Sequence, residues 1–263
     1  MLKINVDKKT AKRIALNIFY PLLAFAITLA VWAIAAKVKD NALVLPMPDV
    51  VLKSFFTLGG ESGFWLSVLA TLLRTFICFI TSFVLALLLA SLAGLFNPMH
   101  RVISPIVSIL RAAPTVAVIL IMYAFMDNDS MAIAVGFLIA FPILYSAFHS
   151  AIVGVDKDLL KMAKLYKVRP IDKIRFIYLP CIEDTLFDMS KSTLSLTLKV
   201  VIASEILATV ARSIGGKIQA AYASYGEVSY LLAWTIVAIV FSFVLEGLVA
   251  IAKKIREVTR CRA

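Results

Sequence analysis

The residues best suited to chemistry in this chain lie in one otherwise apolar stretch, KSTLSLTLKVVIASE, at residues 191–205. With about 100° of rotation per helical residue, Ser195 and Lys199 lie about 40° and 80° from Lys191, so the three share one stripe. Glu205 lies at the edge of this stripe, about one to two turns farther along. Ionisable side chains within a membrane usually face a bundle interior or an aqueous path. We predict that Lys191, Ser195, Lys199 and Glu205 line a translocation path, with Lys199 meeting an anionic group.

The two lysines also fit a purely structural role. Lys191 would reach the membrane interface along its apolar stem and pair with Asp188. Lys199 would pair with an acid on a neighbouring span, such as Glu246. The sequence leaves both interpretations of the stripe open.

The composition of the chain is that of an integral membrane protein. Of its 263 residues, 62% are hydrophobic and only 16% are charged, and the mean hydropathy is +0.95. Soluble domains average about 45–50% apolar and about 25% charged residues, and a membrane span needs roughly 20 mostly apolar residues. We predict an all-α fold, a single transmembrane domain over residues 1–263, with six spans at about 14–36, 64–95, 102–126, 131–153, 184–210 and 230–252.

The distribution of basic residues predicts the orientation of these spans, because cytoplasmic loops are enriched in lysine and arginine. Most of the 27 basic residues lie in the tail 1–13, the loop 154–183 and the tail 253–263, which share one side of a six-span chain. Both termini are therefore expected in the cytoplasm. The net charge of +11 is explained as a topology signal and needs no nucleic acid. The opposite side carries Lys37, Lys39, Lys53, Arg212 and Lys217.

Several local features are predicted around the spans. Arg74 and Arg111 interrupt apolar segments and are expected to serve helix packing or the membrane interface. Pro48 is expected to start a short amphipathic helix on the external side. Residues 127–130, Asp-Asn-Asp-Ser, are typical of a tight turn.

The loop 154–183 is predicted to contain two short helices. Its first part has helical periodicity up to Pro170, which disfavours helix at the preceding residue. A second helix is expected over residues 171–177 and should end at Pro180. Helices this short are not stable alone, so they must pack on the membrane domain or on a partner.

The spacing of this loop resembles that of the membrane subunit, or permease, of type I ABC importers. That family carries Glu-Ala-Ala, three residues, Gly, nine residues, Ile, one residue and Leu-Pro. Here KMA at 161–163 is followed after three residues by Lys167 and after nine more by IYLP at 177–180. The segments RAAPTVAVILIMYAF and ASEILATVARSIGGKIQAA are also similar, the latter to the nitrate, sulfonate and taurine branch. The resemblance covers about residues 45–255.

The resemblance implies that the loop docks on a cytoplasmic ATPase dimer, which hydrolyses the ATP. It also implies a second permease chain, expected to be an identical copy, an extracytoplasmic binding protein, and a place in the bacterial cytoplasmic membrane as a multi-pass protein. Glu205 is implied to be a structural or gating residue. Lys167 replaces the family's glycine and is expected to alter the turn. The ATPase-coupling residues are then Asp158, Leu159, Lys161, Met162, Ala163, Lys164, Lys167 and Arg169.

No catalytic motif accompanies these features. The sequence lacks a Gly-x-x-x-x-Gly-Lys-Ser/Thr loop, so the chain is expected to bind no cofactor and to be no enzyme. Gly215-Gly216 is interpreted as a turn. His100 and His149 are far apart in sequence, which gives little support for a metal site or a catalytic pair. A stand-alone secondary transporter or channel is the main alternative, and a membrane scaffold or sensor, which leaves the loop spacing unexplained, is the third.

Overall fold

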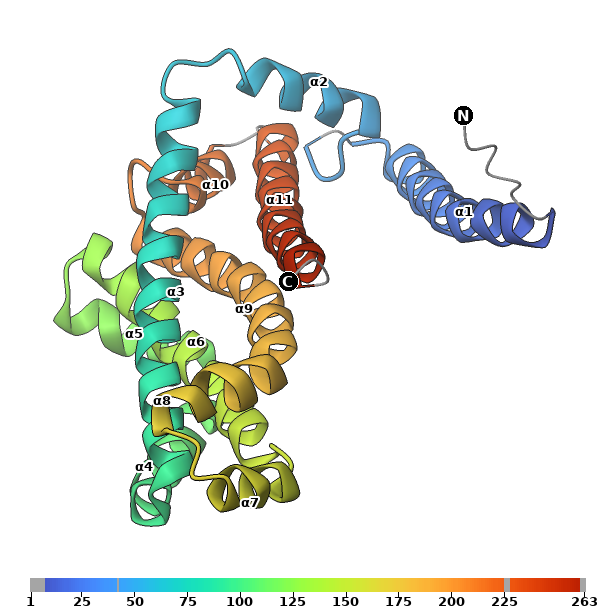
Figure 1. The fold of residues 1–263 in the computed structure, drawn as a ribbon. Coiled ribbons are helices and arrows are strands. Elements are labelled where there is room, and N and C mark those ends of the chain that lie inside the picture. Colours follow the sequence, from blue (N-terminus) through green and yellow to red (C-terminus); the bar gives the residue numbers. More distant parts are fainter. Residues whose placement is uncertain (1–7, 42, 225–227, 261–263) are drawn as a thin grey trace.

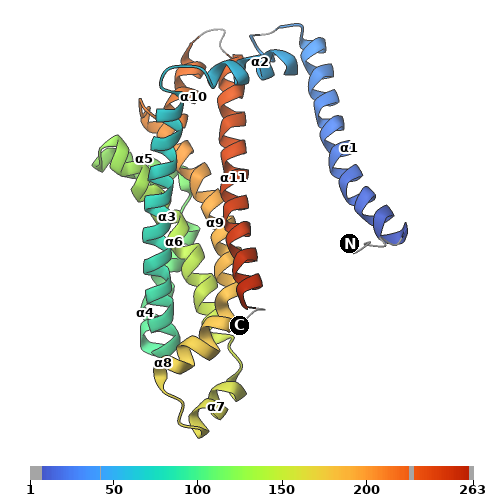
Figure 2. The same cartoon turned by 45° about the horizontal axis from the view of Figure 1, so that its top comes forward.

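The structure is a computed structural model that describes residues 8–41, 43–224 and 228–260, and within these ranges it contains helices and no strand (Figure 1). The all-α prediction is therefore confirmed. Figure 2 shows the long helices of the bundle side by side, with α6 packed most extensively against α3 and α9. These bundle helices are α3 (Phe64–Leu95), α6 (Asn128–Val153), α9 (Leu179–Ala208) and α11 (Val228–Arg260).

The first helix, α1 (Lys8–Lys39), lies apart from the bundle and approaches it through α2 (Pro48–Leu58) (Figure 2). The indole N–H of Trp32 donates to the carbonyl oxygen of Pro46 at 3.2 Å and ties α1 to the connection. Pro48 occupies the first turn of α2, where a missing N–H costs no helical hydrogen bond. The predicted start of this short helix is confirmed.

Stretches long and apolar enough to cross a bilayer lie in α1, α3, α6 and α11. The predicted span 64–95 coincides with α3. α9 covers the predicted span 184–210 but begins earlier, at Leu179, and carries more polar residues than the other four. Its 30 residues extend for about 45 Å, which exceeds the bilayer core of about 30 Å.

The predicted span 102–126 is not one straight helix. It is broken into α4 (Asn97–Ala112) and α5 (Thr115–Phe125), which are bent by 98° relative to each other. The break lies at Ala113, with φ −67° and ψ 129°, directly before Pro114. The proline ring disfavours helical backbone at the residue before it. The apolar segment 102–126 is thus interrupted at Pro114 and is either a broken span or a re-entrant loop.

Two helices occupy the predicted cytoplasmic loop. α7 (Lys157–Leu165) confirms the helix expected from the periodicity of its first part, and α8 (Pro170–Lys173) begins at the predicted break. Asp156 caps α7 by accepting a hydrogen bond from the backbone N–H of Asp158 at 2.8 Å. The loop thus presents a short capped helix at one end of the bundle, which we call the α7 end.

The prediction that Pro180 ends the second helix was wrong. A π-helical turn, Ile174–Tyr178, leads from α8 directly into α9. The backbone N–H of Leu179 bonds to the carbonyl oxygen of Ile174, five residues back. A proline ring clashes with the carbonyl four residues earlier in an α-helix, and the wider π-turn removes that conflict. Residues 170–208 therefore form one uninterrupted helical segment, which bends where it enters the bundle (Figure 2).

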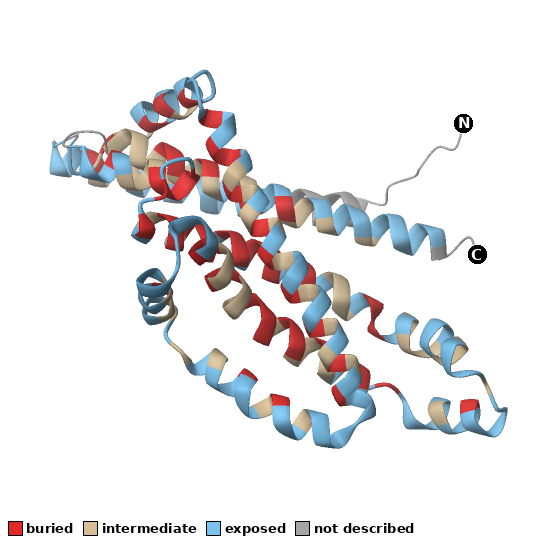
Figure 3. Ribbon diagram, turned by 90° about the vertical axis from the view of Figure 1, so that its left-hand side faces the viewer, coloured by how far each residue is buried: buried red, intermediate tan, exposed pale blue. Residues whose placement is uncertain are grey.

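Buried residues follow the inner faces of the bundle helices, whereas outer faces are exposed (Figure 3). One apolar cluster, around Leu144 and Phe148, lies between α3, α4 and α6. A second, around Leu198 and Trp234, joins α2, α3, α9, α11 and α10 (Ile214–Ala223). Apolar outer faces are expected of helices that are surrounded by lipid.

Candidate functional site

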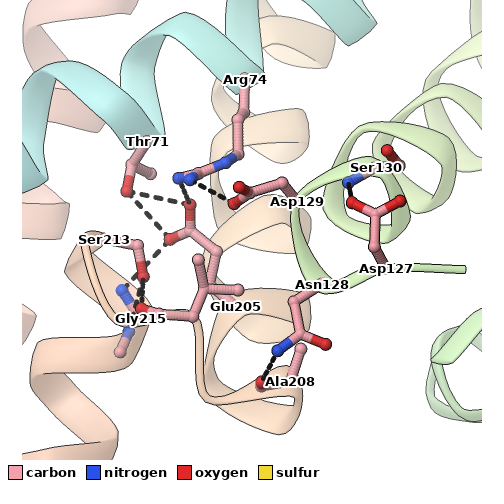
Figure 4. A network of polar contacts seen from close by, with 12 residues as sticks. Thr71, Arg74, Asp127, Asn128, Asp129, Ser130, Glu205, Ala208, Ser213 and Gly215 are labelled. Carbon is pink, nitrogen blue, oxygen red and sulfur yellow. Dashed lines mark hydrogen bonds and ion pairs between the residues drawn. The ribbon is translucent and has the colours of Figure 1, made fainter.

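The fully buried carboxylate of Glu205 joins α9 to α3 and α10 (Figure 4). The hydroxyl oxygen of Thr71 lies 3.0 and 2.9 Å from the two carboxylate oxygens. The guanidinium of Arg74 donates to Oε1 at 3.0 Å, and the backbone N–H of Gly215 donates to Oε2 at 3.2 Å. The negative charge is thus held by an arginine and by the N-terminus of α10, where unpaired helical N–H groups favour an anion.

The start of α10 approaches α9 too closely for side chains at two positions. A Cβ added at Gly215 would lie 2.5 Å from the Cβ of Glu205 and 2.6 Å from the carbonyl oxygen of Ile202. A Cβ at Gly216 would lie 1.8 Å from the carbonyl oxygen of Val210. The two glycines that the sequence suggested as a turn are therefore in the first turn of a helix, and their missing side chains let its N-terminus reach the carboxylate.

Arg74 extends this network to α6. Its other terminal nitrogen donates to the carboxylate of Asp129 at 2.6 Å, and the arginine side chain is 13% exposed. Asp127 caps the same helix, because the backbone N–H of Ser130 donates to its carboxylate at 3.1 Å and thereby lowers the pKa of Asp127 below its ordinary value. The turn predicted at residues 127–130 is the start of α6. Arg74 bridges α9 and α6, which fits the predicted packing role.

The structure separates the members of the predicted polar stripe. Lys191 and Lys199 are exposed, whereas Ser195 is buried with its hydroxyl 2.6 Å from that of Ser242 on α11. At about 40°, Ser195 lies between the two lysines on the helical wheel, but its contact with Ser242 shows that α11 covers α9 at this level. Ser195 therefore packs between helices, and the two lysines remain on the open face.

Neither ion pair predicted for these lysines occurs among the described residues. Asp188 accepts a hydrogen bond from Lys253 on α11 at 2.9 Å in place of Lys191. Within the same ranges Lys199 forms no salt bridge with Glu246 or with any other acid. In a single copy of the chain, the structural role considered for the two lysines therefore lacks both of the ion pairs that it required.

Glu205, also assigned to the path, is positioned differently from the lysines. Its side chain has no exposed surface and is fully engaged by Thr71, Arg74 and Gly215. Such a carboxylate contacts protein groups and not a passing solute. Its surroundings favour the structural or gating role that the family resemblance implies.

The residues predicted to contact an ATPase lie on or just after α7, which projects from the bundle (Figure 2). Ala163 is buried. An exposed ion pair of 2.7 Å joins Lys161 to Asp158. The remaining residues of the set are also exposed, namely Leu159, Met162, Lys164, Lys167 and Arg169.

The turn after α7 keeps the backbone that a glycine would adopt. Lys167 has a φ of 51°, in the left-handed region. The N–H of Val168 donates to the carbonyl of Ala163 at 2.9 Å, and the N–H of Lys167 donates to that of Lys164 at 3.1 Å. These two bonds form a Schellman turn. The expectation that Lys167 alters the turn was wrong, although its Cβ costs about 1–2 kcal/mol in this conformation.

His100 and His149, distant in sequence, are neighbours in the structure. Their rings stack with centroids 4.0 Å apart and an interplanar angle of 3°, and the hydroxyl of Tyr145 lies 3.4 Å from Nδ1 of His100. The described residues contain no group of three or more histidine, cysteine or acidic side chains arranged for a metal. The pair therefore packs α4 against α6, and sequence separation was a poor guide to its proximity.

Sequence analysis did not identify the partners of Glu205. The usable signal was Arg74, a charge inside an apolar span that requires an acid within reach. Thr71 precedes it by one turn on the same helical face. Nothing in the sequence around Asp129 indicated that it pairs with Arg74, because only the tertiary fold brings the start of α6 close to α3.

Comparison with known proteins places this arrangement in context. Residues 82–256 match the family of binding-protein-dependent transport system inner membrane components. The nitrate import permease protein NrtB of Leptolyngbya laminosa is 26% identical over 227 residues, which cover 83% of this chain and 80% of that protein. The protein of the same name from Synechocystis sp. is 26% identical over 200 residues, or 73% of this chain and 72% of that protein.

The fold is also found in a solved transporter. A chain of the methionine ABC transporter MetNI, in an inward-facing conformation, matches with a TM-score of 0.63 and 19% identity over 72% of this chain and 95% of that chain. A second crystal form of that transporter gives a TM-score of 0.56 with the same identity, over 71% of this chain and 95% of that chain.

Proposed function

This chain belongs to the family of binding-protein-dependent transport system inner membrane components, the permeases of ABC importers, and we propose that it couples ATP hydrolysis in a cytoplasmic ATPase dimer to the inward movement of a small anion. The family and the apolar helices make it a multi-pass membrane protein. Its own contribution is mechanical: it provides a docking helix, a rigid connection and part of a path.

The observation that carries this proposal is the uninterrupted helical segment 170–208. It begins beside α7, passes through the π-turn, and ends at Ala208, one turn beyond Glu205. At 1.5 Å per residue this segment measures about 58 Å along its bent axis. A displacement of α7 by an ATPase is then transmitted along α9 as a rigid-body movement to the far end of the bundle.

At the far end, the network of Glu205 determines what such a movement does. The carboxylate holds the N-terminus of α10 through Gly215 and holds α3 through Arg74. Tilting of α9 must either carry α10 and α3 along or break charge-assisted hydrogen bonds, which are stronger than neutral ones. We therefore assign Glu205 a gating role in which α9, α3 and α10 move as one unit.

The two exposed lysines of α9 support an anionic solute. Lys191 and Lys199 lie on a face that is uncovered in one copy of the chain and precede the gating network along the same helix. The relatives from Leptolyngbya laminosa and Synechocystis sp. are both called nitrate import permeases. Nitrate or a similarly small anion is therefore the proposed cargo, delivered by an extracytoplasmic binding protein.

A second permease chain, proposed to be an identical copy, would complete the path. In one copy the face of α9 that carries Lys191 and Lys199 is exposed, and α1 presents apolar side chains such as Phe25 and Val31 outward. Both features leave surface for a partner chain to cover. Figure 2 shows α1 beginning and α11 ending toward the α7 end, which supports cytoplasmic termini as the basic residues predict.

Reconstituted transport tests this function directly. Proteoliposomes containing the chain, its ATPase and its binding protein should accumulate nitrate only when ATP and the binding protein are present. Omitting the ATPase should abolish accumulation, because the chain has no nucleotide-binding loop of its own. Accumulation without ATP would support the stand-alone secondary transporter, and accumulation of a neutral amino acid but not of nitrate would remove the anion assignment.

A further inference from the structure

A cavity of about 520 Å³ lies at the α7 end, between the loop helices and the ends of the bundle helices. Its walls come from α3, the last turn of α6, α7, α8, the π-turn and the start of α9. This volume is within the range of about 300–1,000 Å³ that is typical of ligand sites. Of the described residues assigned a functional role above, Lys164 on α7 is the one that lines this cavity.

The apolar wall of the cavity extends into the membrane-spanning part of the bundle. Leu87, Ser91 and Leu95 are spaced four residues apart on α3 and line one side. The distance from Leu87 to Leu95 along the helix axis is about 12 Å. Because α3 is an apolar span, the inner part of the cavity lies at the depth of lipid tails, where a water-soluble partner protein would not reach.

The opposite wall carries positive charge. Lys164 on α7 and Lys173 on α8 line the cavity, and no acidic residue is among the described residues that line it. Neither lysine forms a salt bridge within those ranges. Basic pockets between spans at the cytoplasmic surface are suited to anionic lipid head groups.

We propose that this cavity binds one anionic phospholipid. One acyl chain lies along Leu87, Ser91 and Leu95, and the phosphate lies between the ammonium groups of Lys164 and Lys173. An apolar wall alone would fit many apolar ligands, and two lysines alone would fit any small anion. The two features together favour a lipid with an anionic head group. The bound lipid would join α3 to both loop helices and restrain α7. The binding step itself does not depend on the transport function proposed above.

Lipid retention by the purified full-length chain tests this proposal. The chain is taken from vesicles of equal parts phosphatidylglycerol and phosphatidylcholine into detergent, and the retained lipid is counted by native mass spectrometry. The wild type should retain one phosphatidylglycerol in preference to phosphatidylcholine. Lys173→Gln should reduce this preference about fivefold, the effect of about one favourable charge at the membrane surface.

Two further variants separate the cavity from general surface charge. Arg175→Gln removes the same charge two residues away, but that guanidinium lies over the ring of Phe176, 5.4 Å from its centroid, and outside the cavity, so retention should not change. Ser91→Phe fills the apolar wall and should abolish retention, with an unchanged melting temperature as the control for folding.

Several results would overturn the proposal. Equal retention of both lipids, or equal losses in Lys173→Gln and Arg175→Gln, would reduce the site to nonspecific basic surface. Displacement of the lipid by inorganic phosphate alone would show a head-group site in which the apolar wall has no part. Loss of the bound lipid when the ATPase is added would assign the cavity to that protein.

Discussion

Arg74 on α3 and Glu205 on α9 form an ion pair of 3.0 Å inside the bundle, and the carboxylate has no exposed surface. Asp129 binds the other terminal nitrogen of the same guanidinium. A single arginine therefore connects the helix that carries the lysines to two neighbours. Because a buried charge is stable only with its partners in place, this pair fixes how α3, α6 and α9 sit relative to one another at this end of the bundle.

Removal of the arginine should destabilise the protein strongly. Arg74→Ala leaves the carboxylate of Glu205 buried without its main partner, and we expect a loss of about 3–5 kcal/mol, measured by thermal unfolding in detergent micelles. The double variant Arg74→Leu with Glu205→Leu should lose less, because no unpaired charge remains. Arg111→Ala is the matched control, since that arginine is exposed and its side-chain hydrogen bond within the described residues is a 3.4 Å contact with Ser146. Similar losses in the Arg74 and Arg111 variants would contradict this account.

The close approach of α10 to α9 should make Gly215 intolerant of any side chain. Gly215→Ala places a Cβ within 2.6 Å of a backbone oxygen and should cost about 1–3 kcal/mol, as overpacking does. Gly247→Ala on α11 meets no atom within 4 Å and should be neutral or stabilising by up to about 1 kcal/mol, because alanine favours helix. The free energies of unfolding of the two variants should be compared by thermal unfolding. A Gly215→Ala protein as stable as the wild type would contradict the close contact between α10 and α9.

The left-handed backbone at Lys167 predicts an unusual gain from glycine. Lys167→Gly removes the Cβ conflict and should stabilise the turn by about 0.5–1 kcal/mol, after allowance for the flexibility of glycine in the unfolded chain. Hydrogen exchange at the amide of Val168, which donates to Ala163, should become slower. Lys167→Val, with a β-branched side chain, should make it faster. Faster exchange in the glycine variant would show that the turn is not left-handed in solution.

Lys199, which we propose to line the path, should affect transport without affecting folding. Lys199→Gln and Lys199→Ala remove a charge from an exposed face and should lower nitrate uptake about tenfold, equivalent to about 1.4 kcal/mol, with an unchanged melting temperature. Lys53→Gln on α2 provides the charge-matched control away from α9. Wild-type uptake in both Lys199 variants would remove this residue from the path.

Much of the fold could be predicted from the sequence, because long apolar runs and helical periodicity are local signals. They place α3, α6 and α7 within a few residues. The effect of a proline depends on the backbone around it. Pro114 interrupts its apolar segment as the sequence indicates, whereas Pro180, predicted to end a helix, lies inside one because a π-turn precedes it.

The candidate site was predicted less completely, for a physical reason. Helical angles correctly place Lys191 and Lys199 on one face. They do not show that α11 covers Ser195, which lies between the two lysines on the helical wheel. The contact of Glu205 with Arg74 joins residues 131 positions apart, and no local pattern encodes such a distance. Only packing of the apolar faces brings these charges together.

The most direct test of the central claim concerns contact between α7 and an ATPase. The background for it replaces exposed Cys181 and Cys261, which lies outside the described residues, with serine. Lys164→Cys should then crosslink to a cysteine introduced into the co-expressed ATPase, and the crosslink should stop ATP-driven uptake. Lys53→Cys, on α2 at the opposite end of the molecule (Figure 2), should not crosslink. Labelling of Lys164→Cys by water-soluble reagents, with no crosslink to the ATPase, would contradict the account.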